Sequence, residues 1–295
     1  MSLNIPTHFV QQYSSNIQLL LMQKGSKLRP YVMTGSHVGK QASPVDQIGA
    51  INMQLVTGRF QAMGRVDAPT DRRWVFPSDY DLNQLIDSFD KLRLLTDPNS
   101  SYVQNAVYAA GRQFDDLIID AFFGTAKTGE TGSTSTTFPA ANQVAVGFGA
   151  SGNTGLTVAK LREAKRLLMG YEVDVETDTL TAVVTAKQHD DLLAEAQVIS
   201  TDFNSMPVMV EGKITRFLGI NIIHCERLDT DANSYRRVPV FAKSGMYLGV
   251  WNDMMTDIDR RKDLQSMPWQ AYLTMTAGAT RLEENKTIEI KCSEA

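Results

Sequence analysis

The stretch DPNSSYVQNAVYAAGRQFDDLIIDAFFG, residues 97–124, carries the clearest helical pattern of the chain. Its apolar residues recur every three or four positions, the spacing of one buried helix face; they are Val103, Val107, Ala110, Phe114, Leu117, Ile118 and Ala121. Asn99 or Ser100 can cap the amino end, and Gly124 predicts a left-handed stop. At about 1.5 Å per residue the helix spans roughly 35 Å. We interpret it as a spine against which other segments, from the same or other subunits, are built.

Three acidic residues stand in the carboxyl-terminal half of this spine: Asp115, Asp116 and Asp120. The helix dipole disfavours anions there, at a cost of roughly a few tenths of a kcal/mol for each carboxylate. Arg112 can reach Asp115 or Asp116 within the helix. Asp120 needs a partner from elsewhere. We therefore take all three carboxylates as candidates for contacts between subunits.

The totals describe an ordinary folded protein of 295 residues, long enough for one large domain or two smaller ones. The net charge of −4 and pI near 5.6 argue against a protein whose main task is to grip nucleic acid. Cys225 and Cys292 cannot form a disulfide framework and are read as buried thiols in a reducing compartment. Because the sequence shows no spanning apolar run and no signal peptide, we expect the protein to stay in the cytoplasm where it is made.

Before the spine, the chain predicts segments that cannot fold alone. Residues 7–24 form an amphipathic helix that Gly25 ends, an arm that docks on something else. Residues 25–50 read as extended connector, because glycine and proline punctuate them. Residues 51–81 predict a long hairpin with a turn at 67–71. It carries the contact candidates Arg59, Arg65, Arg72, Arg73 and Trp74, which are either solvated ladder residues of one subunit or anchors between subunits.

After the spine, strands and helices are mixed, so the predicted fold class is α+β. Residues 124–155 are rich in Gly, Ser and Thr and predict a surface loop, or a short strand pair around 144–148. The remaining predicted elements are a helix over 156–171, a buried strand over 179–185, a capped helix through Gln188 and Leu193, strands over 214–225 and 238–243, and two long strands within 269–292.

No motif for metal, cofactor or covalent chemistry is found in the sequence. The four histidines, His8, His37, His189 and His224, are far apart and have no metal-ligand spacing. The segment 35–40 resembles a phosphate loop, but it is one residue short and lacks the Ser or Thr that would bind magnesium. We predict no catalytic residues, no cofactor and no metal. A site assembled from distant residues stays open.

The order of the predicted parts resembles the major capsid protein of tailed bacteriophages, which has the Hong Kong 97-type fold. The likeness runs over nearly the whole chain: arm, arginine-bearing hairpin, spine helix, α+β domain and return strands. Its strongest local marks are RQFDDLIIDAFFG at 112–124, FLGINII at 217–223, GMYLGVW at 245–251, AGATRL at 277–282 and TIEIK at 287–291.

The resemblance implies a division into a 1–45 amino-terminal arm, a 46–80 extended loop, an 81–155 peripheral domain with the spine helix at 99–123, a 156–262 axial domain and 263–295 return strands of the peripheral domain. It implies a non-enzymatic virion protein that self-assembles into hexamers and pentamers of an icosahedral shell around double-stranded DNA. The extended loop would lie on the next subunit. Scaffolding, portal and decoration proteins are the implied partners, with no membrane. Since the chain starts almost directly at the arm, we expect scaffolding to come from a separate protein or from the arm alone.

Three other functions compete with this one. An encapsulin-like compartment shares the fold and would hold protein cargo instead of DNA. A tail tube subunit would be mostly β and would lack so long a spine helix. A soluble enzyme with a site of scattered residues would be a compact monomer or small oligomer.

Some members of the resembled family weld their shells through a lysine on the extended loop. Residues 46–80 contain no lysine here. We therefore expect assembled shells to run as a single monomer band on a denaturing gel. A ladder of covalent multimers would contradict this expectation.

Overall fold

The computed structural model describes residues 22–39, 43–55, 57–59, 64–86, 99–195, 198, 214–265 and 267–294. The arm helix predicted over 7–24 lies outside these ranges except for residues 22–24, which are not helical. Gly25, predicted to end that helix, does adopt a positive φ of 74°.

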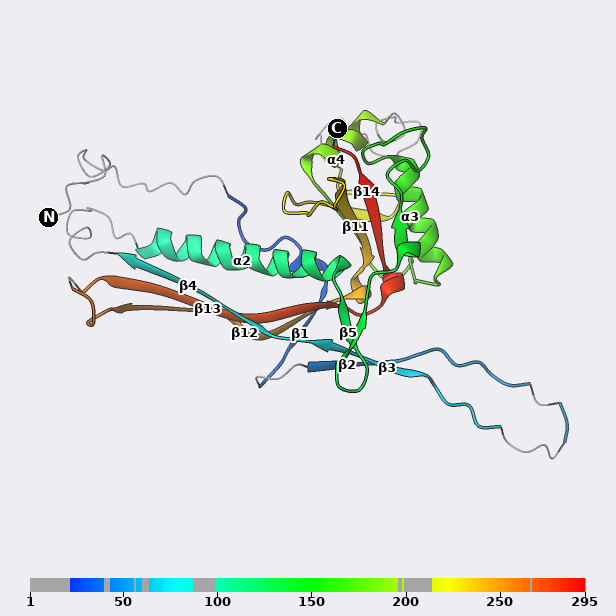
Figure 1. Ribbon diagram of the computed structural model, residues 1–295, viewed down its shortest axis with the longest axis horizontal. Coiled ribbons are helices and arrows are strands. Elements are labelled where there is room, and N and C mark those ends of the chain that lie inside the picture. The colour runs from blue at the N-terminus through cyan, green and yellow to red at the C-terminus, as the bar shows by residue number, and fades with distance from the viewer. Residues whose placement is uncertain are drawn as a thin grey trace.

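The protein is elongated, with a long helix lying along a long sheet (Figure 1). This helix, α2 (Asn99–Phe123), confirms the predicted spine and its bounds. A second, larger sheet with two helices stands at one end of this layer pair, and a two-stranded hairpin projects away from α2 beyond that end. In the described chain, α2 and the long sheet form two layers, and the hairpin projects from them.

The long sheet has four strands, in the order β1-β12-β13-β4. They are β1 (Met33–Ser36), β12 (Met246–Arg260), β13 (Trp269–Arg281) and β4 (Ser78–Ile86). β1 is parallel to β12, and the other pairs are antiparallel. On the central strand β13, alternate residues Leu273, Met275 and Ala277 are buried, because a sheet covered on one face buries every second side chain.

The larger sheet has six strands, in the order β7-β14-β11-β8-β10-β9. They are β7 (Gln143–Val144), β14 (Thr287–Cys292), β11 (Arg236–Ala242), β8 (Leu180–Val184), β10 (Ile220–His224) and β9 (Arg216–Phe217). All five residues of β8 are buried, which confirms the buried strand predicted there. The helices α3 (Val158–Gly170) and α4 (Ala186–Ala194) also confirm the prediction, α4 beginning with a capping box between Thr185 and Gln188.

A third sheet forms the base of the projecting hairpin, in the order β2-β3-β5-β6. Its strands are β2 (Ser43–Ile48), β3 (Thr70–Val75), β5 (Ala126–Thr128) and β6 (Thr134–Thr136). The hairpin was predicted, but its bounds were wrong: the ladder ends at the Ile48–Thr70 pair, and residues 51–55 and 64–69 have no regular structure. The predicted turn at 67–71 therefore overlaps the start of β3. A two-stranded ribbon is marginal in water. β5 pairs with β3 only at Arg73 and Trp74, and the β2–β3 ladder continues from there to the Ile48–Thr70 pair, where it ends.

The connector predicted over 25–50 contains two strands, β1 and β2, and a 3₁₀ turn. Both strands lie at sheet edges, where the glycines and prolines that suggested a connector are tolerated. The loop predicted over 124–155 likewise contains β5, β6 and β7, and the strand pair expected around 144–148 is replaced by the parallel pair of β7 with β14. The short 3₁₀ turns are Arg29–Tyr31, Ala140–Asn142, Lys243–Gly245 and Glu284–Lys286.

Sheet pairing crosses the boundaries of the predicted domains. β12 belongs by sequence to the predicted axial segment 156–262, yet it pairs with β13 of the long sheet. β14 belongs to the predicted return strands, yet it joins the six-stranded sheet through β11. The two return strands do not pair with each other, because the chain passes from one sheet to the other between them. The long strands β4 and β12 were not predicted, because many of their residues are polar and exposed and show no apolar alternation.

One stripe of α2 is buried, and it matches the predicted face in part: Ala110, Phe114 and Ile118 are buried, whereas Val107, Leu117 and Ala121 are only partly buried. Ala106, Ala110, Phe114, Ile118 and Phe122 are each at most 4% exposed and recur every four residues. Full burial of an aromatic or branched aliphatic side chain contributes about 1.5–3 kcal/mol. The packing of this stripe, more than helix propensity, therefore stabilises α2.

The end of α2 differs from its prediction. Gly124 is not among the residues with positive φ, so it does not supply a left-handed stop. Its N–H donates to the carbonyl oxygen of Asp120 at 3.0 Å, and a Cβ at this position would lie 2.6 Å from that oxygen. The glycine is required here for close approach of the backbone.

A buried arginine caps the helix instead. Arg281, at the end of β13, is fully buried, and its Nη1 donates to the carbonyls of Phe122 at 2.7 Å and Gly124 at 3.1 Å. A cation at a helix carboxyl end satisfies carbonyls that have no partner within the helix and interacts favourably with the dipole.

The same arginine is linked to the base of the hairpin through Glu284. Nη2 of Arg281 lies 3.7 Å from Glu284 Oε1, and Nη2 of Arg73 donates to Glu284 Oε2 at 2.7 Å. Only 7% of the Arg73 side chain is exposed. Two arginines and one glutamate thus join β3, β13 and the end of α2.

We expect Arg281→Met to lower the free energy of unfolding of the protomer by about 3–5 kcal/mol, because the carbonyls at the end of α2 lose their buried cation and Glu284 keeps only Arg73 of its two arginines. Thermal or urea denaturation followed by circular dichroism measures this. Arg261→Met, which removes an exposed pair with Asp263 and a 3.5 Å hydrogen bond to Gln270, is the matched control and should unfold like the unmodified protein. Equal stability of the two variants would contradict the prediction.

Candidate subunit interfaces

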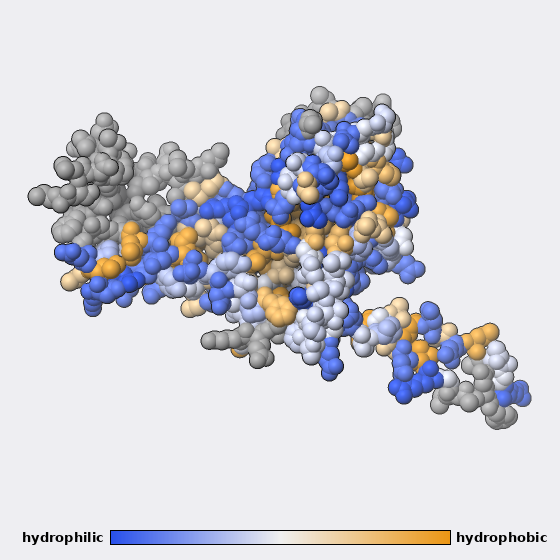
Figure 2. Space-filling model, viewed as in Figure 1, coloured by the Kyte–Doolittle hydropathy of each residue, from blue (hydrophilic) through white to orange (hydrophobic). Residues whose placement is uncertain are grey.

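The projecting hairpin exposes large apolar side chains that the described chain leaves uncovered. Ile48, Ile51, Met53 and Leu55 are 78%, 60%, 102% and 84% exposed. Figure 2 shows hydrophobic and hydrophilic residues side by side along this projection. A contiguous row of exposed apolar residues marks a surface for another molecule.

The predicted arginines of the hairpin divide into two groups. Arg59 and Arg65 lie on the irregular outer part and are exposed; Arg65 pairs with Asp67 at 2.7 Å. Arg59 forms no hydrogen bond or ion pair with any other described residue.

At the base of the hairpin, three predicted candidates are engaged within the chain. Arg72 pairs with Asp46 across the β2–β3 ladder at 2.5 Å, and this hydrogen bond raises the pKa of the guanidinium above its ordinary value. Its guanidinium also lies 5.9 Å from the centre of the Trp74 ring. Trp74 donates its indole N–H to the carbonyl of Gly129 at 2.7 Å. With Arg73 bound to Glu284, these side chains fasten the hairpin to its own protomer.

On the spine helix, Asp115 holds the amino-terminal segment. The carboxylate is fully buried and accepts hydrogen bonds from the backbone N–H groups of Lys27 (2.9 Å) and Leu28 (3.0 Å). The Ser26 hydroxyl and the Gln23 amide donate to it as well, each at 2.5 Å. Several donors to one buried carboxylate compensate the cost of burying its charge.

The same segment crosses α2 on a pair of glycines. A Cβ at Gly111 would lie 2.5 Å from the backbone of Gly25, so the helix and the segment touch main chain to main chain. Arg112, predicted to pair with Asp115 or Asp116, instead donates to the carbonyl of Gln23 at 3.3 Å. Arg112 therefore contacts the amino-terminal segment rather than either of the two acids that it could reach within the helix.

The remaining two acids have different surroundings. Asp116 is paired with Arg227 from the loop after β10. Asp120 is exposed, and its carboxylate has no hydrogen bond or ion pair among the described residues. Its partial burial, followed by the negative charges of Asp229 and Asp116, raises the pKa of its carboxyl above the ordinary value.

The two histidines of the six-stranded sheet region, His189 and His224, lie close to one cleft. His189 Nε2 accepts the N–H of Ile214 at 3.2 Å, and His224 Nε2 lies 2.6 Å from Glu226 Oε1. Both histidines line a cleft of about 740 Å³ between α4, β10 and the segment at Lys27 and Tyr31. Within the described ranges, no three His, Cys, Asp or Glu side chains are placed to share a metal ion. No helix among the described residues is long and apolar enough to cross a bilayer.

Sequence reasoning missed the roles of three charged residues, two of which, Arg281 and Lys160, are fully buried. Arg281 lies in the quoted segment AGATRL, but a lone arginine near a strand end gives no sign that it caps a distant helix. Glu284 gave no sign either. Lys160, fully buried, donates to the carbonyls of Thr154, Gly155 and Lys291 at 2.8–3.0 Å. Cys225 and Cys292 are buried free thiols, as predicted, and burial raises the pKa of Cys292 to about 12.

The fold is that of viral shell proteins. Three similar solved structures are the capsid of cyanophage Pam1 (14% identity, TM-score 0.72, covering 100% of both chains), the capsid of cyanophage P-SCSP1u (14%, 0.70, covering 97% of this chain and 93% of that one) and the capsid of Ralstonia phage GP4 (12%, 0.69, covering 96% and 94%). These likenesses confirm the predicted α+β architecture of the Hong Kong 97 type. The comparison with curated proteins found no match.

The family is shown by the sequence itself. Residues 5–294 match the family described as phage capsid protein. The chain belongs to this family and is a structural protein of a phage capsid, as the resemblance implied.

We expect Asp115→Asn to release the amino-terminal segment. The new amide keeps one acceptor oxygen but places N–H donors against the N–H groups of Lys27 and Leu28, so amide exchange there should accelerate about tenfold or more. Hydrogen–deuterium exchange with mass spectrometry measures this. Asp116→Asn, which weakens only the Arg227 pair, should leave exchange at residues 25–31 unchanged. Identical exchange in both variants would show that Asp115 does not hold the segment.

Proposed function

We propose that this chain is the major capsid protein of a tailed phage, which assembles as hexamers and pentamers into an icosahedral shell around double-stranded DNA. The observation that carries the proposal is the projecting hairpin, whose exposed apolar residues have no cover within the protomer. In a family of capsid proteins, the molecule that covers them is another copy of the same chain.

The energetics of such a contact favour repeated assembly. Each large apolar side chain that becomes buried contributes about 1.5–3 kcal/mol, and a stable interface buries roughly 1,200–2,000 Å². The hairpin and the surface that receives it are different patches, so each copy both gives and receives a hairpin. Such head-to-tail contacts form rings when the rotation between copies closes. Hexamers and pentamers are rings of this kind.

The proposal also includes the partners and the place of assembly. Separate scaffolding and portal proteins, and decoration proteins where the particle carries them, act with the shell. Assembly takes place in the host cytoplasm, and the finished protein resides in the virion. Contact with packaged DNA is non-specific, which suits the net charge of −4, because a strongly basic surface would retain the DNA.

Electron microscopy of the purified protein tests the proposal. We expect closed icosahedral particles, or hexamers and pentamers. A variant with Leu55→Asp should fold but lose assembly, because it places a charge on the outer hairpin. Val38→Asp, at a residue that is 101% exposed outside the hairpin, is the matched control and should assemble. A monodisperse monomer at high concentration would refute the proposal, and particles from phage-infected cells that contain protein cargo and no DNA would refute its genome-enclosing part.

A further inference from the structure

We propose that the hollow beside Asp120, at the carboxyl end of α2, receives the outer hairpin of a second copy, and that Arg59 of that copy pairs with Asp120. This inference rests on the proposed function and names the contact that joins one subunit to the next.

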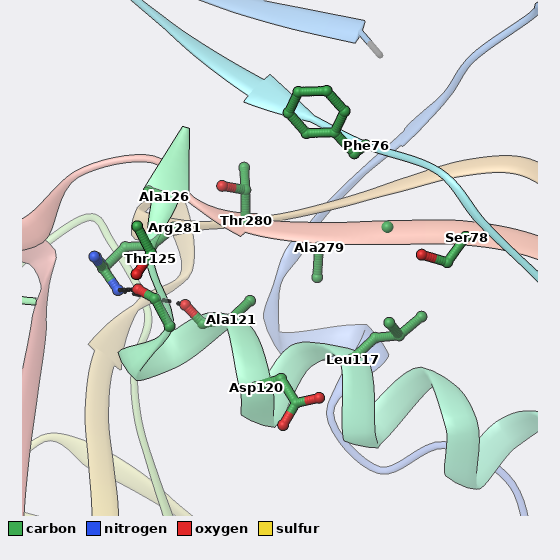
Figure 3. A pocket seen from close by; sticks show the side chains of 12 residues that line it. Phe76, Ser78, Leu117, Asp120, Ala121, Thr125, Ala126, Ala279, Thr280 and Arg281 are labelled. Atoms are coloured by element: carbon green, nitrogen blue, oxygen red, sulfur yellow. Dashed lines mark hydrogen bonds between the residues drawn. The ribbon is translucent and has the colours of Figure 1, made fainter. Parts of the chain in front are cut away.

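The receiving hollow lies between the last turns of α2, the end of β13 and the segment that follows β3 (Figure 3). Its volume is about 230 Å³. Leu117 and Ala121 of the helix point toward Ala279 of β13, and Phe76 stands across from them. These side chains give the hollow an apolar wall. Asp120 also lines it, and in Figure 3 its carboxylate points away from β13 on the outer side of the helix. A second hollow of about 160 Å³, which Asp229 and Arg237 also line, adjoins Asp120 on its other side.

The surroundings of Asp120 favour a cation. The carboxylate lies in the last turn of α2, where the dipole opposes negative charge. Asp116 and Asp229 add their own negative potential. Arg237 lines the adjoining hollow but is engaged elsewhere: its Nε donates to Glu289 at 2.5 Å and its guanidinium lies 4.2 Å from the centre of the Phe123 ring, and it forms no ion pair with Asp120 in the described chain. A guanidinium from a second molecule would offset both the helix dipole and the negative charges of Asp116 and Asp229.

Among the four arginines of the hairpin, Arg59 is the one that has no partner in the described chain and is therefore the candidate to pair with Asp120. Arg65 is paired with Asp67, Arg72 with Asp46, and Arg73 with Glu284. Arg59 is exposed, lies at a turn of the hairpin and has no partner in the described chain. Exposed apolar side chains flank it along the hairpin: Met53, Leu55 and Val66. They fit the apolar wall while the arginine meets the carboxylate, so charge and hydropathy match together.

The pairing must join two copies. In Figure 1 the hairpin runs from its base away from α2. Arg59 belongs to the outer part of this hairpin and Asp120 to the last turn of α2, so the hairpin of one chain leads away from the carboxyl end of its own helix. The β2–β3 ladder and the bond between Arg73 and Glu284 hold the hairpin in this direction.

Charge reversal tests the pair in full-length protein. Asp120→Arg and Arg59→Asp should each reduce the fraction of protein in particles or capsomers about tenfold or more, because each places like charges in contact. The double variant should restore assembly. Glu176→Arg, at an exposed acid of the segment between α3 and β8, is the control for the change in net charge and should assemble normally. Normal assembly by either single variant, or a double variant no better than its parents, would overturn the inference.

Cysteine pairing in trans provides a second measurement, independent of assembly yield. A mixture of Arg59→Cys protein with Asp120→Cys protein should form disulfide-linked dimers on oxidation, seen on a non-reducing gel. Each protein alone should not, since Cys225 and Cys292 are buried. Absence of dimers in particles that have assembled would reject the Arg59–Asp120 contact and leave the proposed shell function intact, whereas failure of the unmodified protein to assemble would reject that function itself.

Discussion

The arrangement of this protein depends on one buried guanidinium. Arg281 ends β13, caps the carbonyls at the end of α2 and shares Glu284 with Arg73 of β3. Burying a cation is costly unless it is paired, and here Nη1 donates to carbonyls of α2 while Nη2 lies 3.7 Å from Glu284. Separating the three elements would leave this charge without those partners. This requirement sets the direction of the projecting hairpin relative to the spine helix, and hence where the contact surfaces of a subunit lie.

A capsid subunit has physical needs that differ from those of an enzyme. It must present large surfaces to its copies, and a thin elongated body does this better than a compact one. Here the core lies between α2 and the long sheet and within the six-stranded sheet, while the outer hairpin has no core of its own. The free energy that offsets the entropy cost of ordering this hairpin must come from contacts with neighbouring subunits. The charges on the spine helix are divided accordingly: Asp115 and Asp116 serve the protomer, and Asp120 stays unpaired in the described chain.

Local sequence patterns predicted much of the fold but only part of the candidate interfaces. The spine helix, the helices over 158–170 and 186–194 and the buried strand β8 follow from periodicity and capping, which act within a few residues. The exposed strands β4 and β12 escaped because solvent-facing strands lack a distinctive apolar alternation. The eight predicted contact residues were correctly located on the hairpin and spine, yet nothing in the sequence could separate those used within the chain from those left unpaired.

The sequence by itself determined that a long amphipathic helix and an arginine-rich hairpin would exist, because helix periodicity and turn chemistry are local properties. Only the tertiary structure decided what each charge does. Asp115 meets residues 87–92 positions away, and Arg281 meets the end of a helix 157–160 positions away. Such pairings depend on where distant segments meet in space. The sequence next to each charged residue contains no pattern that identifies its distant partner.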